Sequence, residues 1–257
     1  MCNENIKKLP FWETISRSFK YVLKNNKLLL LLLPLVGVVT IIQALIKFPL
    51  MCTYNQNFCV EGWQNIFSNV VLVIVAVGII INYCRSIICK ENIDITSLNF
   101  FKRLAFYILW SFALTFVVGI PVALVIVILS LMGLSVTTIM VLTLFSFIAL
   151  GVVFAPLIVA FPALAVDDNK IIRPSKLFAM AKGNKMSIFF GQLVIMIPYI
   201  VLSNTFVYIY LLIGANNFVL SLLFVFIAVF LSLVDASFRG AYFAHIYQFL
   251  KYYDKDE

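Results

Sequence analysis

The cationic residues of this chain fall into four clusters, which alternate with long uncharged, apolar runs. Every lysine and arginine except Lys47 belongs to one of them: Lys7, Lys8, Arg17, Lys20, Lys24 and Lys27; Arg85, Lys90, Lys102 and Arg103; Lys170, Arg173, Lys176, Lys182 and Lys185; Arg239, Lys251 and Lys255. Lysine and arginine close to membrane spans stay on the cytoplasmic side. The pattern therefore predicts an all-α, multi-pass membrane protein with its N-terminus and C-terminus in the cytoplasm.

The composition agrees with a lipid solvent. The chain is 63% hydrophobic and 12% charged, with a mean hydropathy of +1.07, whereas a soluble domain carries about 25% charged residues. We interpret the net charge of +8 as an excess of lysine and arginine that keeps the segments between spans in the cytoplasm. Such charge also suits contact with anionic lipid head groups. No nucleic-acid-binding motif accompanies it. We therefore expect membrane lipids as partners and no nucleic acid.

The apolar runs predict six spans within a single integral membrane domain, residues 1–257, since one crossing takes about 20 residues. The spans are expected at about 28–46, 66–84, 104–131, 138–166, 187–213 and 218–238. Met132-Gly133-Leu134-Ser135 is the expected turn between the third and fourth spans, with Gly133 as the breaker. Gly214–Asn217 is the expected turn between the fifth and sixth. The last helix is expected to continue past Asp235 toward Phe249.

Two cytoplasmic segments read as amphipathic helices that lie in the membrane plane, at about 10–24 and 174–182. In the first, Phe11, Ile15, Phe19 and Val22 share one helical face. Lys24-Asn25-Asn26-Lys27 after the first helix matches Lys182-Gly183-Asn184-Lys185 after the second. We hypothesise a three-fold repeat of an in-plane helix followed by a hairpin, with Leu98–Arg103 as a weaker middle copy. The alternative is that cytoplasmic loops acquire such residues independently.

Proline and an ionisable pair give the candidate sites inside the spans. Pro156 and Pro162 interrupt one span, and each removes a backbone hydrogen bond. They either shape a kinked helix or form a hinge. Asp235 and Arg239 lie four residues apart in the order that favours an ion pair. The pair either eases the exit of the helix from the membrane or acts as a gate or partner contact.

The remaining reactive residues predict no catalytic, cofactor or metal site. Cys52 and Cys59 flank the first outer loop, where a disulfide between them is feasible if this side is a periplasm. The alternative is that both remain free thiols. His245 is the only histidine, which rules out zinc motifs with two histidines. The serines of the spans have no histidine at a matching depth for intramembrane proteolysis. We therefore expect no enzyme and no cofactor.

Several short motifs of the second half resemble the YciC-like family of bacterial inner-membrane proteins. They are Phe154-Ala155-Pro156, Ala165-Val166-Asp167-Asp168, Pro174-Ser175-Lys176-Leu177, Lys182-Gly183-Asn184 and the closing aromatic stretch Tyr242–Leu250. That family is similar to the membrane domain preceding some glycerophosphodiester phosphodiesterases. The resemblance implies a bacterial inner (plasma) membrane location and transfers no catalytic residues. The expected function is a non-enzymatic accessory of the envelope or of membrane organisation; the alternative is a small-molecule or lipid transporter.

Overall fold

The fold is all-helical in a computed structural model that describes residues 8–25, 34, 36–41, 60–91, 97–213 and 218–253. These ranges contain helices and turns but no β-strand. The elements are α1 (Phe11–Lys24), α3 (Val60–Ile88), α4 (Leu98–Leu131), α5 (Val136–Phe154), the 3-10 helix η1 (Ala155–Val159), α6 (Ala160–Ala165), α7 (Pro174–Met180), α8 (Lys185–Ile213) and α9 (Phe218–Tyr253).

Five stretches of the described chain are long and apolar enough to cross a membrane. They are Asn69–Ile88, Leu98–Leu131, Val136–Ala165, Lys185–Ile209 and Leu222–Tyr252. They correspond to the second through sixth predicted spans. The first predicted span, 28–46, lies outside the described residues except for 34 and 36–41. A count of six spans therefore stays a prediction.

The hairpin of α4 and α5 turns where the sequence predicts. α4 ends at Leu131 and α5 begins at Val136. Between them Gly133 has φ +68°, a left-handed conformation that glycine adopts without steric cost. The Ser135 hydroxyl then caps α5 by accepting the Thr138 N–H at 3.3 Å. The other predicted turn, Gly214–Asn217, lies outside the described residues.

Two helix boundaries differ from the predicted spans. α4 begins at Leu98 rather than 104, because the Ser97 side chain caps it by accepting the Phe100 N–H at 3.1 Å. The cationic stretch Leu98–Arg103 is thus the start of a helix that is long and apolar enough to cross a membrane, which corrects its interpretation as a separate in-plane helix. α9 runs without a break to Tyr253, consistent with the predicted extension beyond Asp235.

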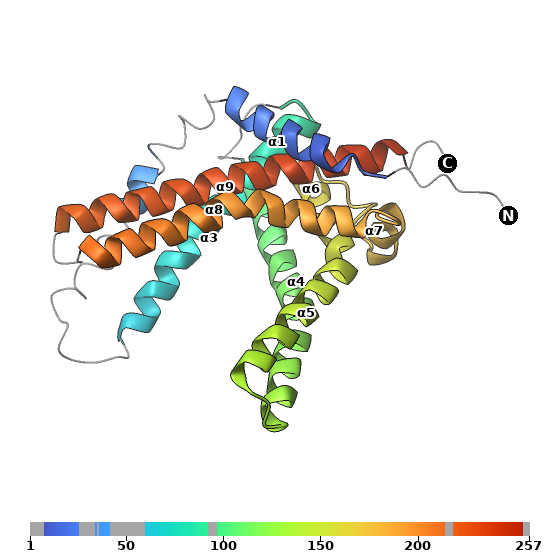
Figure 1. Ribbon diagram of the computed structural model, residues 1–257. Helices are drawn as coiled ribbons and strands as arrows, with labels where there is room; N and C mark the ends of the chain where they lie inside the picture. Colours follow the sequence, from blue (N-terminus) through green and yellow to red (C-terminus); the bar gives the residue numbers. More distant parts are fainter. Residues whose placement is uncertain are drawn as a thin grey trace.

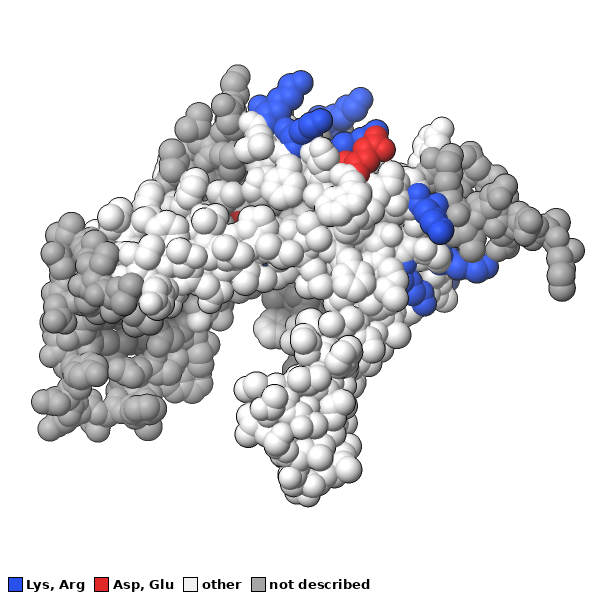
Figure 2. Space-filling model, viewed as in Figure 1, with Lys and Arg blue, Asp and Glu red and all other residues white. Residues whose placement is uncertain are grey.

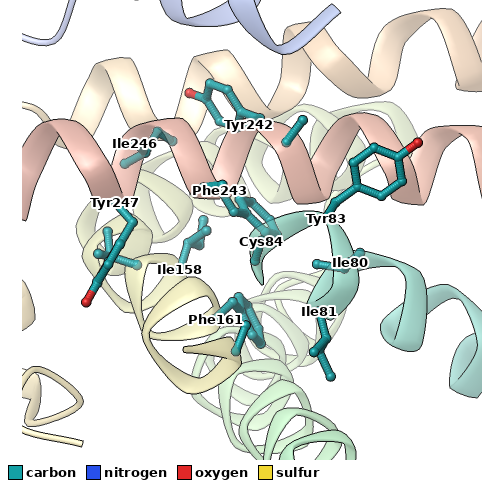
Figure 3. Close-up of a cluster of buried hydrophobic side chains, with 14 of the residues drawn as sticks. Ile80, Ile81, Tyr83, Cys84, Ile158, Phe161, Tyr242, Phe243, Ile246 and Tyr247 are labelled. Atoms are coloured by element: carbon teal, nitrogen blue, oxygen red, sulfur yellow. The ribbon is translucent and has the colours of Figure 1, made fainter. Parts of the chain in front are cut away.

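The long helices form two hairpins that diverge from a common junction (Figure 1). α8 and α9 pack side by side, and the α4–α5 hairpin projects away from them. η1, α6 and α7 lie where the two hairpins meet, and α3 packs most extensively against α9. Buried side chains concentrate at this junction. In Figure 3, Ile80 and Cys84 of α3, Phe161 of α6 and Phe243 of α9 point into the same core.

The N-terminal helix packs on the protein through the face that the sequence predicts to be apolar. Ile15 and Val22 are buried, and the Phe19 ring lies 4.5 Å from the Phe238 ring of α9. Thr14 and Ser18 are also buried there. Their hydroxyls remain hydrogen-bonded, since each donates to a backbone carbonyl four residues earlier. The apolar stripe of α1 therefore contacts α9 and α8. A position in the membrane plane stays a prediction.

The close approach of α3 and α9 gives a first testable prediction. A Cβ on Gly240 would lie 2.9 Å from Tyr83 Cβ and 3.0 Å from the Ile80 backbone. Gly240→Ala should therefore lower the free energy of unfolding by about 1–3 kcal/mol through overpacking, measured by thermal unfolding of the detergent-purified protein. The matched control is Gly119→Ala, because a Cβ there meets nothing within 4 Å. Equal stability of both variants would contradict this packing.

Candidate functional site

Four charged side chains lie where the ends of α3 and α6 meet the start of α4. We call Arg85, Glu91, Arg103 and Asp167 the Asp167 cluster. Arg103 donates from Nε to both Asp167 oxygens at 3.0 Å and from Nη2 to Oδ2 at 2.6 Å. Arg85 Nη1 lies 3.7 Å from Asp167 Oδ2, and Arg85 also pairs with Glu91. The cluster therefore joins three segments that are far apart in the sequence.

The turn after α6 places Asp167 in this cluster. α6 ends at Ala165, and Asp167 has φ +59°, a left-handed conformation that Asp tolerates better than most residues. The Asp168 N–H donates to the Ala163 carbonyl at 2.9 Å, which closes the turn. Arg85 Nη1 donates to the Ala165 carbonyl at 3.0 Å. The turn is therefore fixed both by its own backbone and by a cation from α3.

The adjacent carboxylate, Asp168, contacts the end of α9. Its Oδ2 accepts a hydrogen bond from Tyr247 Oη at 2.6 Å and one from Lys251 Nζ at 2.5 Å. Burial on its own raises the pKa of Asp168, but the hydrogen bonds from Lys251 and Tyr247 and the charge of Lys251 outweigh it and hold the pKa below its usual value. Asp167 and Asp168 thus connect one turn to α3, α4 and α9.

A pocket of about 640 Å³ opens beside Asp167. One wall is the face of α4 from Asn99 to Ala113, and the other is formed by residues of the segment from Leu164 to Ile172. Charged and amide side chains line the end near the start of α4, and apolar side chains line the rest. The arrangement is amphiphilic, and its volume lies in the range of small-molecule and cofactor sites.

The predicted pair Asp235 and Arg239 forms an ion pair within α9. The Asp235 side chain is 1% exposed and the Arg239 side chain 29%. A buried carboxylate requires such a partner, because an isolated charge is costly to remove from water. The pocket described above is lined by other residues. The structure thus shows the predicted ion pair, and its role as a gate or partner contact stays a prediction.

The predicted proline site lies where the fourth span changes its helical geometry. α5 ends at Phe154, and the chain continues as η1, which contains Pro156, and then as α6, which contains Pro162. The side chains of Ala155–Val159 are all buried. The prolines therefore shape a packed segment at the junction. Their role as a hinge stays a prediction.

The cysteine predictions are answered only in part. Cys52 and Cys59 lie outside the described residues. Cys84 is buried and Cys89 exposed, both as free thiols. Burial raises the pKa of the Cys89 thiol despite the opposing charge of Arg85. Among the residues that the structure describes, no three His, Cys, Asp or Glu side chains are grouped so that they could hold a metal ion.

Comparison with known proteins adds no relative. No family model, no curated protein and no solved structure matches this chain. The resemblance to YciC-like proteins therefore rests on its sequence motifs alone. Three of those motifs carry long-range contacts: Asp167 and Asp168 form the turn described above, Tyr247 of the closing aromatic stretch donates to Asp168, and Asn184 Oδ1 accepts the Leu9 N–H at 2.6 Å. Sequence reasoning missed Arg103 and Lys251 as partners of Asp167 and Asp168, since it interpreted the cations only as charge that sets the topology.

The lowered pKa of Asp168 predicts a pH-dependent contribution to stability. When the pKa of a carboxyl is lower in the folded protein than in the unfolded chain, ionisation stabilises the fold at any pH above the unfolded pKa, about 3.9 for Asp. This stabilisation is lost as the pH falls through the pKa of the folded protein. Asp168→Asn should therefore lower the melting temperature by about 2–4 °C at pH 7. The difference from wild type should persist to about pH 5 and shrink below about pH 4.

The matched control for this measurement is Glu13→Gln. Glu13 forms an exposed ion pair with Arg17, with both side chains more than half exposed, and such pairs contribute little. Its melting temperature should follow wild type at every pH. A constant difference for Asp168→Asn down to pH 3 would show that the carboxylate is not stabilised by Lys251 and Tyr247.

Proposed function

We propose that the chain is a non-enzymatic, multi-pass protein of the bacterial inner membrane, with both termini cytoplasmic, that supports membrane or envelope organisation. The observation that carries the proposal is the distribution of charge. Lys and Arg gather over α1 and the neighbouring end of the molecule, while the projecting part of the α4–α5 hairpin, beyond Lys102 and Arg103 at the start of α4, carries none (Figure 2). Under the positive-inside rule, the charged end faces the cytoplasm.

The charged side chains at the junction support a structural role. Arg85, Arg103 and Lys251 each contact Asp167 or Asp168, so their charges are used to hold helices together. The exposed cations Lys20 and Lys176 suit contact with anionic head groups. A rigid, cationic cytoplasmic end on a lipid-embedded helical body fits a protein that anchors or orders other membrane components.

The second candidate is a small-molecule or lipid transporter. The amphiphilic pocket beside Asp167 and the divergence of the two hairpins favour it. Reconstituted liposomes separate the two functions, because a transporter should give saturable solute or lipid flux that Pro156→Ala abolishes. Deletion of the gene should instead change membrane integrity without loss of a particular flux if the protein is an organiser.

The proposed topology is testable by cysteine labelling. In a variant with its five native cysteines replaced by serine, Leu134→Cys at the α4–α5 turn should react with a membrane-impermeant maleimide in intact spheroplasts. Lys176→Cys in α7 should react only after permeabilisation, because positive charge stays inside. The opposite labelling pattern would refute the cytoplasmic placement of the charged end.

A further inference from the structure

The pocket beside Asp167 has a polarity gradient along α4. Asn99, Lys102 and Phe106 line it at spacings of three and four residues, so they share one helical face. Leu109 and Ala113 continue this face toward the hydrocarbon. The distance along the helix from Lys102 to Ala113 is about 16 Å, close to the thickness of one leaflet, about 15 Å. The wall therefore has the length and polarity order of a phospholipid.

The two cations at the polar end have different surroundings. Arg103 is held by Asp167 in a bidentate contact and is 11% exposed. Lys102 is exposed, and among the residues that the structure describes it forms no ion pair. The second wall adds the amide of Asn169. Lys102 can thus meet a phosphate without breaking the Asp167 cluster, while the two asparagines supply neutral donors.

The apolar part of the pocket is bounded by fixed side chains. Trp110 donates its indole N–H to the Leu157 carbonyl of η1 at 3.2 Å, which holds the ring at the junction. Leu164 and Ile172 line the opposite wall, and both are only partly exposed. An acyl chain between these walls is in contact on two sides, unlike a lipid that touches a single helix.

We propose that this pocket binds one anionic phospholipid, with its phosphate at Lys102 and an acyl chain along Phe106, Leu109 and Ala113. The inference rests on the membrane location of the proposed function and does not depend on the accessory role. A soluble phosphate compound shares the head-group chemistry, but it would leave the apolar length of the pocket uncovered. The cationic end and the apolar wall together favour the lipid.

Quenching of Trp110 fluorescence tests the proposal. The chain has three tryptophans, and replacing Trp12 and Trp63 by phenylalanine leaves Trp110 as the only one. The full-length protein in dodecyl maltoside is titrated with phosphatidylglycerol brominated on its acyl chain, and separately with phosphatidylcholine brominated in the same way. Bromine quenches only on contact. Phosphatidylglycerol should quench saturably and at lower mole fraction than phosphatidylcholine.

Two variants test the two ends of the pocket against matched controls. Lys102→Gln should weaken phosphatidylglycerol binding about fivefold and leave phosphatidylcholine unchanged, whereas Lys20→Gln on α1 should have no effect. Ala113→Phe should reduce quenching by filling the groove. Ala105→Phe is its control, because Ala105 is also exposed on α4 but does not line the pocket.

Several outcomes would overturn the proposal. Equal quenching by the two lipids, or equal effects of Ala113→Phe and Ala105→Phe, would mean that only annular lipid contacts Trp110. Displacement of the brominated lipid by millimolar glycerol 1-phosphate or inorganic phosphate would assign the site to a soluble phosphate compound. Thermal unfolding of each variant checks that it remains folded. Because the titration uses purified protein, its result is independent of the topology labelling and the flux assays.

Discussion

The contact of Asp167 with Arg103 and Arg85 is the interaction that fixes the base of the α4–α5 hairpin against α3. Lipid tails are as apolar as leucine, so the hydrophobic effect gives spanning helices little reason to associate. Charge-assisted hydrogen bonds are stronger than neutral ones, and here they join α3, α4 and the turn after α6. Both arginines are largely covered, at 14% and 11% exposed. Removing Asp167 would therefore leave two close cations without their common partner.

Close helix packing reinforces this junction where charge is absent. The tight approach of α9 to α3 occurs at Gly240, and Cys84 Sγ contacts the Gly240 carbonyl at 3.4 Å. Small residues allow such backbone approach, which is a main source of helix association in membranes. Away from the junction α4 has mostly exposed apolar side chains, including Phe112 and Phe116, as expected for a helix that faces lipid. The molecule is thus tightly packed at one end and divergent toward the other.

The sequence predicts the elements that depend on local chemistry. Gly133 and Ser135 specify the α4–α5 turn through a left-handed φ and a cap, so this turn is found where expected. The start of α4 at Leu98 was missed because a charged stretch next to a span reads equally well as a separate helix. Only the Ser97 cap distinguishes the two, and serine is common in loops. The pairing of Asp168 with Tyr247 and Lys251 joins positions distant in sequence, which no local pattern specifies.

In the two matched tetrads Asn25 aligns with Gly183, and Asn26, the counterpart of Asn184, lies outside the described residues. Asn25 follows α1, and its side-chain amide donates to the Tyr21 carbonyl of the same helix at 2.9 Å. Asn184 follows Gly183, which has φ +77°, and it is buried and accepts the Leu9 N–H. The first asparagine therefore ends its own helix, whereas the second links the entry of α1 to the start of α8. This bond brings described residues of the first and third cationic clusters to the same end of the fold.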